Sequence, residues 1–341
     1  MLSKSKTTWL STIVVLGFLS VHLTPLTAQK PVEPSKPAPK DGPAPVAQAV
    51  SFAGLWDTSF GRMRLRQSEQ DVSGRYAYSA GSKVVGHVQD RKLSFTYTEP
   101  NAKGEGWFEL SADGKSFTGK WREAGGTDWK PWNGRRVQAE PGVIWLVVIE
   151  ANWEHSLADT EYSFGQMLRT YFARDAKVRV RHRFFSDEAS LTKWLSEVTY
   201  LAEPVVISLS THGLANGIPT GGKIVGADAL AECVRDCEHI RLLHFSSCLA
   251  MKGNLAEQIT KKLGPSATFP ISGYTTSVDW AGSAVIEFMY FDLLLCRRLP
   301  PKKAAEQLLK LLPYAGDEAA KGAILPPAGF RIHYPEPQPK P

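Results

Sequence analysis

The sequence has 341 residues, 43% of them hydrophobic, which is enough for two modest domains with buried cores. The formal charge is +6, and the basic residues are spread along the chain rather than gathered in one run. This argues against a protein that binds nucleic acid or an anionic membrane surface. Four cysteines are too few for a fold held together by disulfides.

Residues 1–28 have the pattern of a secretory signal peptide. Two lysines precede an apolar stretch from Trp9 to Val21, and small residues follow it up to Ala28. The apolar stretch is short for a membrane-spanning helix, so we expect no stable membrane insertion. We expect cleavage near Ala28 and export to the periplasm or the extracellular space. The alternative is an uncleaved signal anchor.

Two segments follow with different compositions. Residues 29–48 are rich in proline, alanine and lysine, a composition that buries little surface and predicts an extended linker. In residues 49–138, apolar and polar residues alternate in short runs separated by turn residues such as Asp113-Gly114. Alternation of this kind predicts an antiparallel meander that closes into a small β-barrel or sandwich.

The predicted β domain contains tryptophans that allow two interpretations. They fill the core and the ends of a small barrel, as side chains do in such barrels, or they form an aromatic ligand-binding face. The sequence does not identify a ligand for such a face. The tryptophans concerned are Trp56, Trp107, Trp121, Trp129 and Trp132.

Residues 142–313 alternate short apolar strands with amphipathic helices. This alternation predicts an α/β domain, with a parallel sheet flanked by helices on both faces. Strands are expected at 143–149, 178–184, 205–209, 242–245 and 269–274, and a small hairpin near 223–225. Helices are expected at 162–172, after an N-cap at Ser186, and at 227–235, 255–263, 281–295 and 302–312. Residues 314–341 are expected to form a C-terminal tail.

Two of these strands end in small hydroxyl residues followed by a reactive side chain. Strand 205–209 leads to His212-Gly213, and strand 242–245 leads to Cys248. Because the carboxyl ends of parallel strands share one edge of a sheet, we expect His212 and Cys248 to meet there. A cysteine beside a histidine is a nucleophile beside a base. Taken singly, a cysteine at a strand end is usually a small buried apolar residue, and a histidine in a loop usually belongs to the polar surface.

An apolar strand ending in His212-Gly213, followed by one ending in Cys248 in the same α/β sheet, resembles the clan CD cysteine peptidases. That group includes the caspases, metacaspases, gingipains, legumains and separases. The resemblance covers residues 142–313 and implies a caspase-like fold that cleaves a peptide or protein substrate with a Cys248–His212 dyad. It also implies an oxyanion hole formed by the backbone N–H groups of Gly213 and Cys248. No cofactor is implied.

The residues around Cys248 differ from the caspase pattern. Caspases have Gln-Ala before the cysteine and a glycine two residues after it. Here the sequence reads Ser246-Ser247-Cys248-Leu249-Ala250. The resemblance is therefore to the broader clan rather than to the caspases themselves.

Two acidic residues are candidates for the substrate pocket. Asp159 follows the first strand of the α/β domain, and Asp279 follows the fifth. A carboxylate in the pocket would favour lysine or arginine as the P1 side chain, through charge pairing. The alternative for each is an acid at a helix start or in a solvated loop.

Other reactive side chains are expected to have structural roles. Cys233 and Cys237, with His239 nearby, fall short of the four ligands of a zinc site, so no metal is expected. His244 lies inside a strand, before its carboxyl end, and Cys296 lies at the end of an apolar helix. We expect both to be part of the core.

Two other functions fit parts of the sequence. One is a non-catalytic caspase-like fold that acts at the cell envelope as a binding or scaffold protein through its β domain. The other is a nucleotide-binding α/β domain. It is disfavoured because Glu150-Ala151-Asn152 follows the first strand, where a glycine-rich phosphate loop would be needed.

Overall fold

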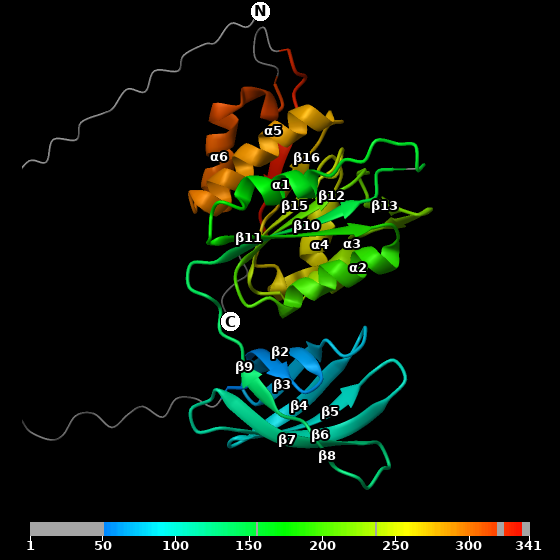
Figure 1. Ribbon diagram of the computed structural model, residues 1–341, viewed down its shortest axis with the longest axis vertical. Coiled ribbons are helices and arrows are strands. Elements are labelled where there is room, and N and C mark those ends of the chain that lie inside the picture. The colour runs from blue at the N-terminus through cyan, green and yellow to red at the C-terminus, as the bar shows by residue number, and fades with distance from the viewer. Residues whose placement is uncertain (1–50, 155, 236, 319–323, 336–341) are drawn as a thin grey trace, which may run out of the picture. The chain divides into compact units, whose positions relative to one another are not determined.

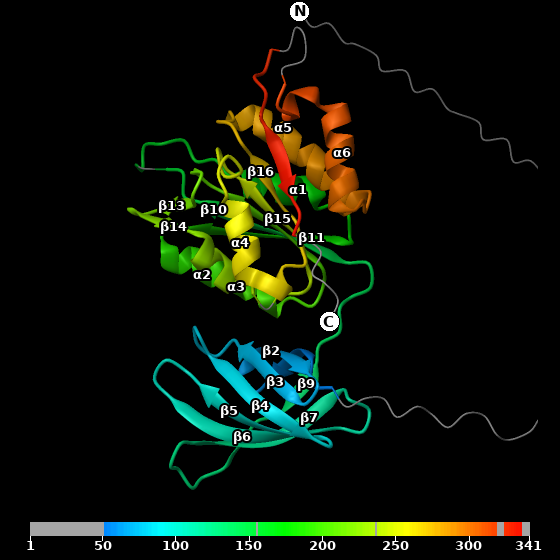
Figure 2. The same cartoon turned by 180° about the vertical axis from the view of Figure 1, so that it is seen from behind.

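The computed structural model describes residues 51–154, 156–235, 237–318 and 324–335. The predicted signal peptide and linker lie outside the described residues. Figures 1 and 2 show, from opposite sides, an antiparallel β-barrel and a mixed β-sheet with helices on both faces. In the described ranges no helix is both long enough and apolar enough to cross a membrane.

The barrel is built from antiparallel strands that close into a ring. Their order is β6-β5-β4-β3-β2-β1-β9-β7, and β7 pairs back onto β6. This confirms the predicted antiparallel barrel. The strands are β1 (Gly54–Thr58), β2 (Gly61–Ser68), β3 (Asp71–Tyr76), β4 (Lys83–Gln89), β5 (Lys92–Thr98), β6 (Lys103–Leu110), β7 (Ser116–Glu123) and β9 (Gly134–Arg136), with β8 (Lys130–Pro131) paired to β7.

The barrel core is filled by the inward-facing residue of each alternating pair. In β5, Leu93, Phe95 and Tyr97 are buried and the residues between them are exposed, which is the period of two seen in the sequence. Trp56 and Trp132 are fully buried in the same core, as the core-filling interpretation predicts.

The other three tryptophans of the barrel are not core residues. Trp129 is exposed, and Trp107 is half-buried under the Lys92 ammonium group. Trp121 is half-buried and packs against Phe60. The tryptophans are therefore divided between the core and the surface of the barrel.

The second sheet has six strands in the order β11-β10-β12-β15-β16-β17. The first five are mutually parallel, but β17 is antiparallel to β16, so the predicted parallel sheet is in fact mixed. This last strand comes from the segment expected to be a tail. The strands are β10 (Ile144–Ala151), β11 (Val178–Phe185), β12 (Val205–Ser210), β15 (Ile240–Ser246), β16 (Ile271–Tyr274) and β17 (Phe330–His333).

Helices cover both faces of this sheet (Figures 1 and 2). One face packs against α1 (Phe164–Phe172), α5 (Trp280–Phe291) and α6 (Pro301–Leu311), and the other against α2 (Glu188–Glu197), α3 (Ala227–Val234) and α4 (Leu255–Leu263). The helix predicted to continue to 295 instead ends in a π-turn, Asp292–Cys296. The predicted hairpin forms from β13 (Ile218–Thr220) and β14 (Lys223–Val225).

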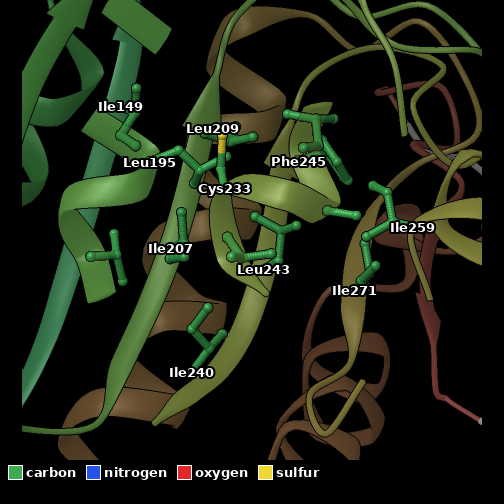
Figure 3. Packing of buried hydrophobic residues seen from close by; sticks show 14 of the residues in the cluster. Ile149, Leu195, Ile207, Leu209, Cys233, Ile240, Leu243, Phe245, Ile259 and Ile271 are labelled. Atoms are coloured by element: carbon green, nitrogen blue, oxygen red, sulfur yellow. The ribbon is translucent and has the colours of Figure 1, made fainter. Parts of the chain in front are cut away.

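The central strand β12 is buried at every position, because helices cover both of its faces. Val206 belongs to the core under α1, α5 and α6. Ile207 and Leu209 point to the opposite core, where they lie beside Leu243 and Phe245 of β15 (Figure 3). Each such side chain stabilises the fold by about 1.5–3 kcal/mol relative to an exposed one. The strand is therefore a rigid support for the residues that follow it.

Side chains that accept backbone N–H groups cap the N-termini of α1, α2 and α5. Ser163 caps α1, and Asp279 caps α5 by accepting the Gly282 N–H at 2.8 Å. The N-cap of α2 is Asp187, one residue after the predicted Ser186, because the Asp187 side chain forms a capping box with Ser190.

Candidate functional site

The structure brings His212 and Cys248 to the same edge of the sheet. Ser210 of β12 pairs with Ser246 of β15, and each reactive residue follows two positions later. Gly213 allows the two loops to touch: a Cβ atom placed on it would lie 2.2 Å from the Cys248 carbonyl oxygen. Any side chain at position 213 would therefore separate the histidine loop from the cysteine loop.

A pocket of about 420 Å³ opens at this edge and contains both residues. The lining residues with hydroxyl groups come from the ends of β12 and β15. They are Ser210, Thr211, Ser246 and Ser247. The pocket walls are mostly aromatic and come from the loop before α1, the first residue of α1 and the start of α5, namely Trp153, Tyr162, Phe164 and Trp280. Trp153 stacks on Tyr162, and Tyr162 meets Trp280 edge to face at 5.7 Å.

Cys248 is partly exposed, and backbone groups hold its sulfur. The Val278 N–H donates to Sγ at 3.4 Å, and Sγ lies 3.6 Å from the Val278 carbonyl oxygen. The next residue, Leu249, has φ = 61°, a left-handed conformation that is unfavourable for a leucine. Backbone strain of this kind concentrates at functional sites, where the surrounding structure enforces it.

His212 is exposed, and its ring meets Trp153 edge to face at 5.0 Å. Within the described part of the chain its side chain makes no hydrogen bond, and none joins it to Cys248. In unliganded enzymes, catalytic hydrogen bonds are often long and tighten only with substrate. The two side chains therefore line one pocket, and no hydrogen bond joins them in the described structure.

Two backbone donors remain available beside Cys248. In the ranges that the structure describes, neither the Gly213 N–H nor the Cys248 N–H is used by a protein acceptor. Their residues are in direct contact across the two loops. An oxyanion hole requires donors that face the reacting carbonyl; Cys248 lines the pocket, whereas Gly213 is not among its lining residues.

Glu150 organises the wall behind His212, and the sequence reasoning missed it. It is fully buried at the end of β10, in register with Ser210 of β12. Five donors converge on its carboxylate: Trp153 Nε1 at 3.0 Å, Ser163 Oγ at 2.6 Å, the N–H groups of Phe164 at 2.8 Å and Gly165 at 3.0 Å, and His182 Nε2 at 2.8 Å.

These donors keep Glu150 ionised. Burial alone would raise the pKa of its carboxyl group, but hydrogen bonds from His182, Ser163 and Trp153 outweigh burial and lower the pKa below its ordinary value. The carboxylate also lies at the N-terminus of α1, where the helix dipole favours negative charge. An acid at the end of an otherwise apolar strand was the signal in the sequence that could have identified it.

The two predicted pocket acids occupy other positions. Asp279 caps α5 and is not among the pocket-lining residues, although its neighbours Val278 and Trp280 are. Asp159 is exposed in the loop before α1, where its carboxylate accepts the Ser156 N–H at 2.9 Å, and it does not line the pocket either.

His244 belongs to a buried polar cluster with Ser272, Tyr274 and Glu287. It is fully buried, with Nδ1 at 2.8 Å from Ser272 Oγ and Nε2 at 3.3 Å from Glu287. The Tyr274 hydroxyl donates to Glu287 at 3.0 Å, and burial followed by the Glu287 charge raises the Tyr274 pKa. This histidine does not line the pocket, so its position is that of a core residue.

The other three cysteines lie outside the pocket and are not joined in disulfides among the described residues. Cys233 and Cys237 are buried, and burial raises the pKa of Cys233. Burial and the nearby Asp292 raise the pKa of Cys296 to about 11. Across the described ranges, no group of three or more histidine, cysteine, aspartate or glutamate side chains is placed to hold a metal ion.

No protein-family model matches the sequence, and no curated protein matches it. The basis for a functional assignment is therefore the set of residues at this sheet edge and their geometry.

Proposed function

We propose that the protein is an exported cysteine endopeptidase whose α/β domain has a caspase-like fold of the clan CD type. One observation carries the proposal: His212 and Cys248 follow adjacent parallel strands and line one pocket. The backbone N–H groups of Gly213 and Cys248 have no acceptor among the described residues. The position of the pocket, at the carboxyl edge of the parallel strands, is where α/β proteins place their chemistry.

Each residue has a role in acyl transfer. The Cys248 thiolate attacks the peptide carbonyl carbon, and the N–H groups of Gly213 and Cys248 bind the oxyanion that forms. His212 gives a proton to the departing amine, which leaves a thioester on Cys248. It then takes a proton from the water that attacks the thioester, so the thiol is regenerated and an acid is released.

The pocket favours a substrate side chain that contacts aromatic rings. Its volume of about 420 Å³ accommodates one or two side chains rather than a folded domain. Trp153 and Trp280 offer ring faces or edges, which bind apolar, aromatic or cationic groups. We retain lysine or arginine as the proposed P1 side chain through contact with these rings, because neither Asp279 nor Asp159 lines the pocket.

A positional peptide library tests the proposal. We expect cleavage by the protein lacking residues 1–48, with P1 preference for lysine, arginine or an aromatic residue over aspartate. Trp280→Ala should change the P1 preference, because Trp280 lines the pocket. The matched control is Trp129→Ala, which removes an exposed tryptophan of the barrel and should leave the preference unchanged. A library with no cleaved member would contradict the proposal.

A second candidate is a non-catalytic binding or scaffold protein with the same fold. It is favoured by the contact between Cys248 Sγ and the Val278 backbone and by the absence of a His212–Cys248 hydrogen bond in the described residues. This candidate predicts that Cys248 reacts with electrophiles no faster than an ordinary free cysteine.

A further inference from the structure

One end of the β-barrel contains a second pocket, of about 210 Å³. It lies where β3, β5 and β7 end, beside the turn between β1 and β2. Pockets for drug-sized ligands are roughly 300–1,000 Å³, so this one fits a single head group or side chain. None of its lining residues belongs to the pocket at Cys248.

The lining of this barrel-end pocket is mainly aromatic. Trp132 is buried at its base and meets Phe60 at 5.0 Å and Tyr76 at 5.1 Å. Trp121 forms another side and meets Phe60 at 5.5 Å and Tyr97 at 5.6 Å. All four contacts are edge to face, a geometry that fixes the orientation of each ring. The rings therefore form a preorganised cage.

Two carboxylates line the same cage. Glu99 follows β5 and accepts the Tyr76 hydroxyl at 2.6 Å, and Glu123 is the last residue of β7. In the part of the chain that the structure describes, neither carboxylate forms an ion pair. The cage therefore carries two carboxylates that are not paired with any described cation.

Two buried polar atoms of the cage also lack partners within the described residues. They are the Tyr97 hydroxyl and Trp121 Nε1. Tyr97 is only 3% exposed, and a buried hydroxyl without a hydrogen bond is unfavourable. Burial, followed by the charges of Glu99 and Glu123, raises the pKa of Tyr97 to about 12, so this hydroxyl lies in a negative potential.

We infer that the barrel-end pocket binds an alkylammonium group, as carried by a lysine side chain or a small free amine. Aromatic faces attract cations, and carboxylates accept ammonium hydrogens, so both parts of the cage select the same ligand. An anion would meet two like charges, and a neutral ligand would leave both carboxylates uncompensated. The Lys130 ammonium group lies over the Trp121 ring at 5.0 Å, but Lys130 is not among the pocket-lining residues.

The test is a titration of the full chain, observed through the indole N–H signal of Trp121, which is assigned with Trp121→Phe. The probes are Nα-acetyl-lysine methylamide, n-butylammonium and the neutral Nα-acetyl-norleucine methylamide. We expect saturable shifts with the two cations and none with the neutral probe. Similar affinities for the two cations would indicate recognition of the amine alone, whereas tighter binding of the lysine derivative would indicate a peptide ligand.

Substitutions that remove the charge of Glu99 or Glu123 test whether these carboxylates bind the ammonium group. Glu123→Gln should weaken binding of n-butylammonium about threefold, and Glu99→Gln with Glu123→Gln about tenfold. The matched control is Glu109→Gln, an exposed carboxylate of β6 outside the pocket, which should bind as the wild type does. Equal shifts by the neutral probe, no shift by either cation, or unchanged affinity in the double variant would overturn the inference.

Discussion

Replacement of Cys248 by alanine is expected to abolish peptide hydrolysis and to leave the fold intact. Removing the nucleophile of a catalytic unit costs a factor of about 10⁴ or more in turnover. Cys248 is partly exposed, and its sulfur contacts only the Val278 backbone among the hydrogen bonds of the described chain. We therefore expect the free energy of unfolding to change by less than about 1 kcal/mol.

The measurement is turnover of the best library peptide, together with urea unfolding of both proteins. Cys296→Ala is the matched control, since it removes another half-buried thiol away from the pocket. It should retain wild-type turnover. Turnover that persists in Cys248→Ala would assign the activity to another residue, and the dyad would have to be abandoned.

Replacement of Glu150 by glutamine is expected to be strongly destabilising, although the two side chains have the same shape. The amide accepts fewer hydrogen bonds than the carboxylate, and each buried donor left without an acceptor, His182 among them, costs about 1–3 kcal/mol. The new amide NH₂ group would also face N–H donors that now bind a carboxylate oxygen, including Gly165 N–H at 3.0 Å.

The same substitution should change the reactivity of the site. Glu150 fixes Trp153, and Trp153 contacts the ring of His212. Glu150 is therefore a positioning residue, and we expect Glu150→Gln to lower the rate at which an electrophile modifies Cys248 even where the variant is fully folded. If Glu150→Asp restores that rate, the carboxylate is the group that positions Trp153 and, through it, His212. The control is Glu161→Gln, an exposed acid in the loop before α1, which should change neither stability nor rate.

The difference in unfolding free energy between the wild type and Glu150→Gln should become smaller at acidic pH. Because the folded pKa of Glu150 is below its ordinary value of 4.5, the carboxylate stabilises the fold above about pH 4.5. This contribution is lost as the pH falls through the lower, folded pKa. The gap in unfolding free energy between wild type and Glu150→Gln should therefore be constant at neutral pH and shrink in acid. A gap that is unchanged at pH 3 would show that Glu150 does not act through its charge.

Local sequence patterns predicted most elements of the structure, because alternation and apolar runs reflect which faces are buried. The period of two around Leu93 and Phe95 indicated the barrel, and the continuous apolar run 205–209 indicated a strand covered on both faces. His212 and Cys248 each follow a predicted parallel strand, and the carboxyl ends of such strands share one edge of the sheet. This also predicted that the two residues would be neighbours.

Features set by distant partners were not predictable in the same way. Strand β17 is short and lies about 55 residues after β16, so no local pattern revealed that it pairs antiparallel with Ser272 and Tyr274. The role of Glu150 depends on donors from α1 and β11, which only the folded chain brings together. Asp279 was expected in the pocket, but its carboxylate is used by the backbone of α5.

The most direct test of the Cys248–His212 dyad is the rate of thiol alkylation by iodoacetamide across pH, with each adduct located by mass spectrometry. The account predicts rapid modification of Cys248 at neutral pH, with a sharp loss of rate in His212→Ala. Cys296, with its pKa of about 11, should react slowly, as should the buried Cys233. Slow modification of Cys248 that is unaffected by His212→Ala would contradict the dyad and favour the binding protein.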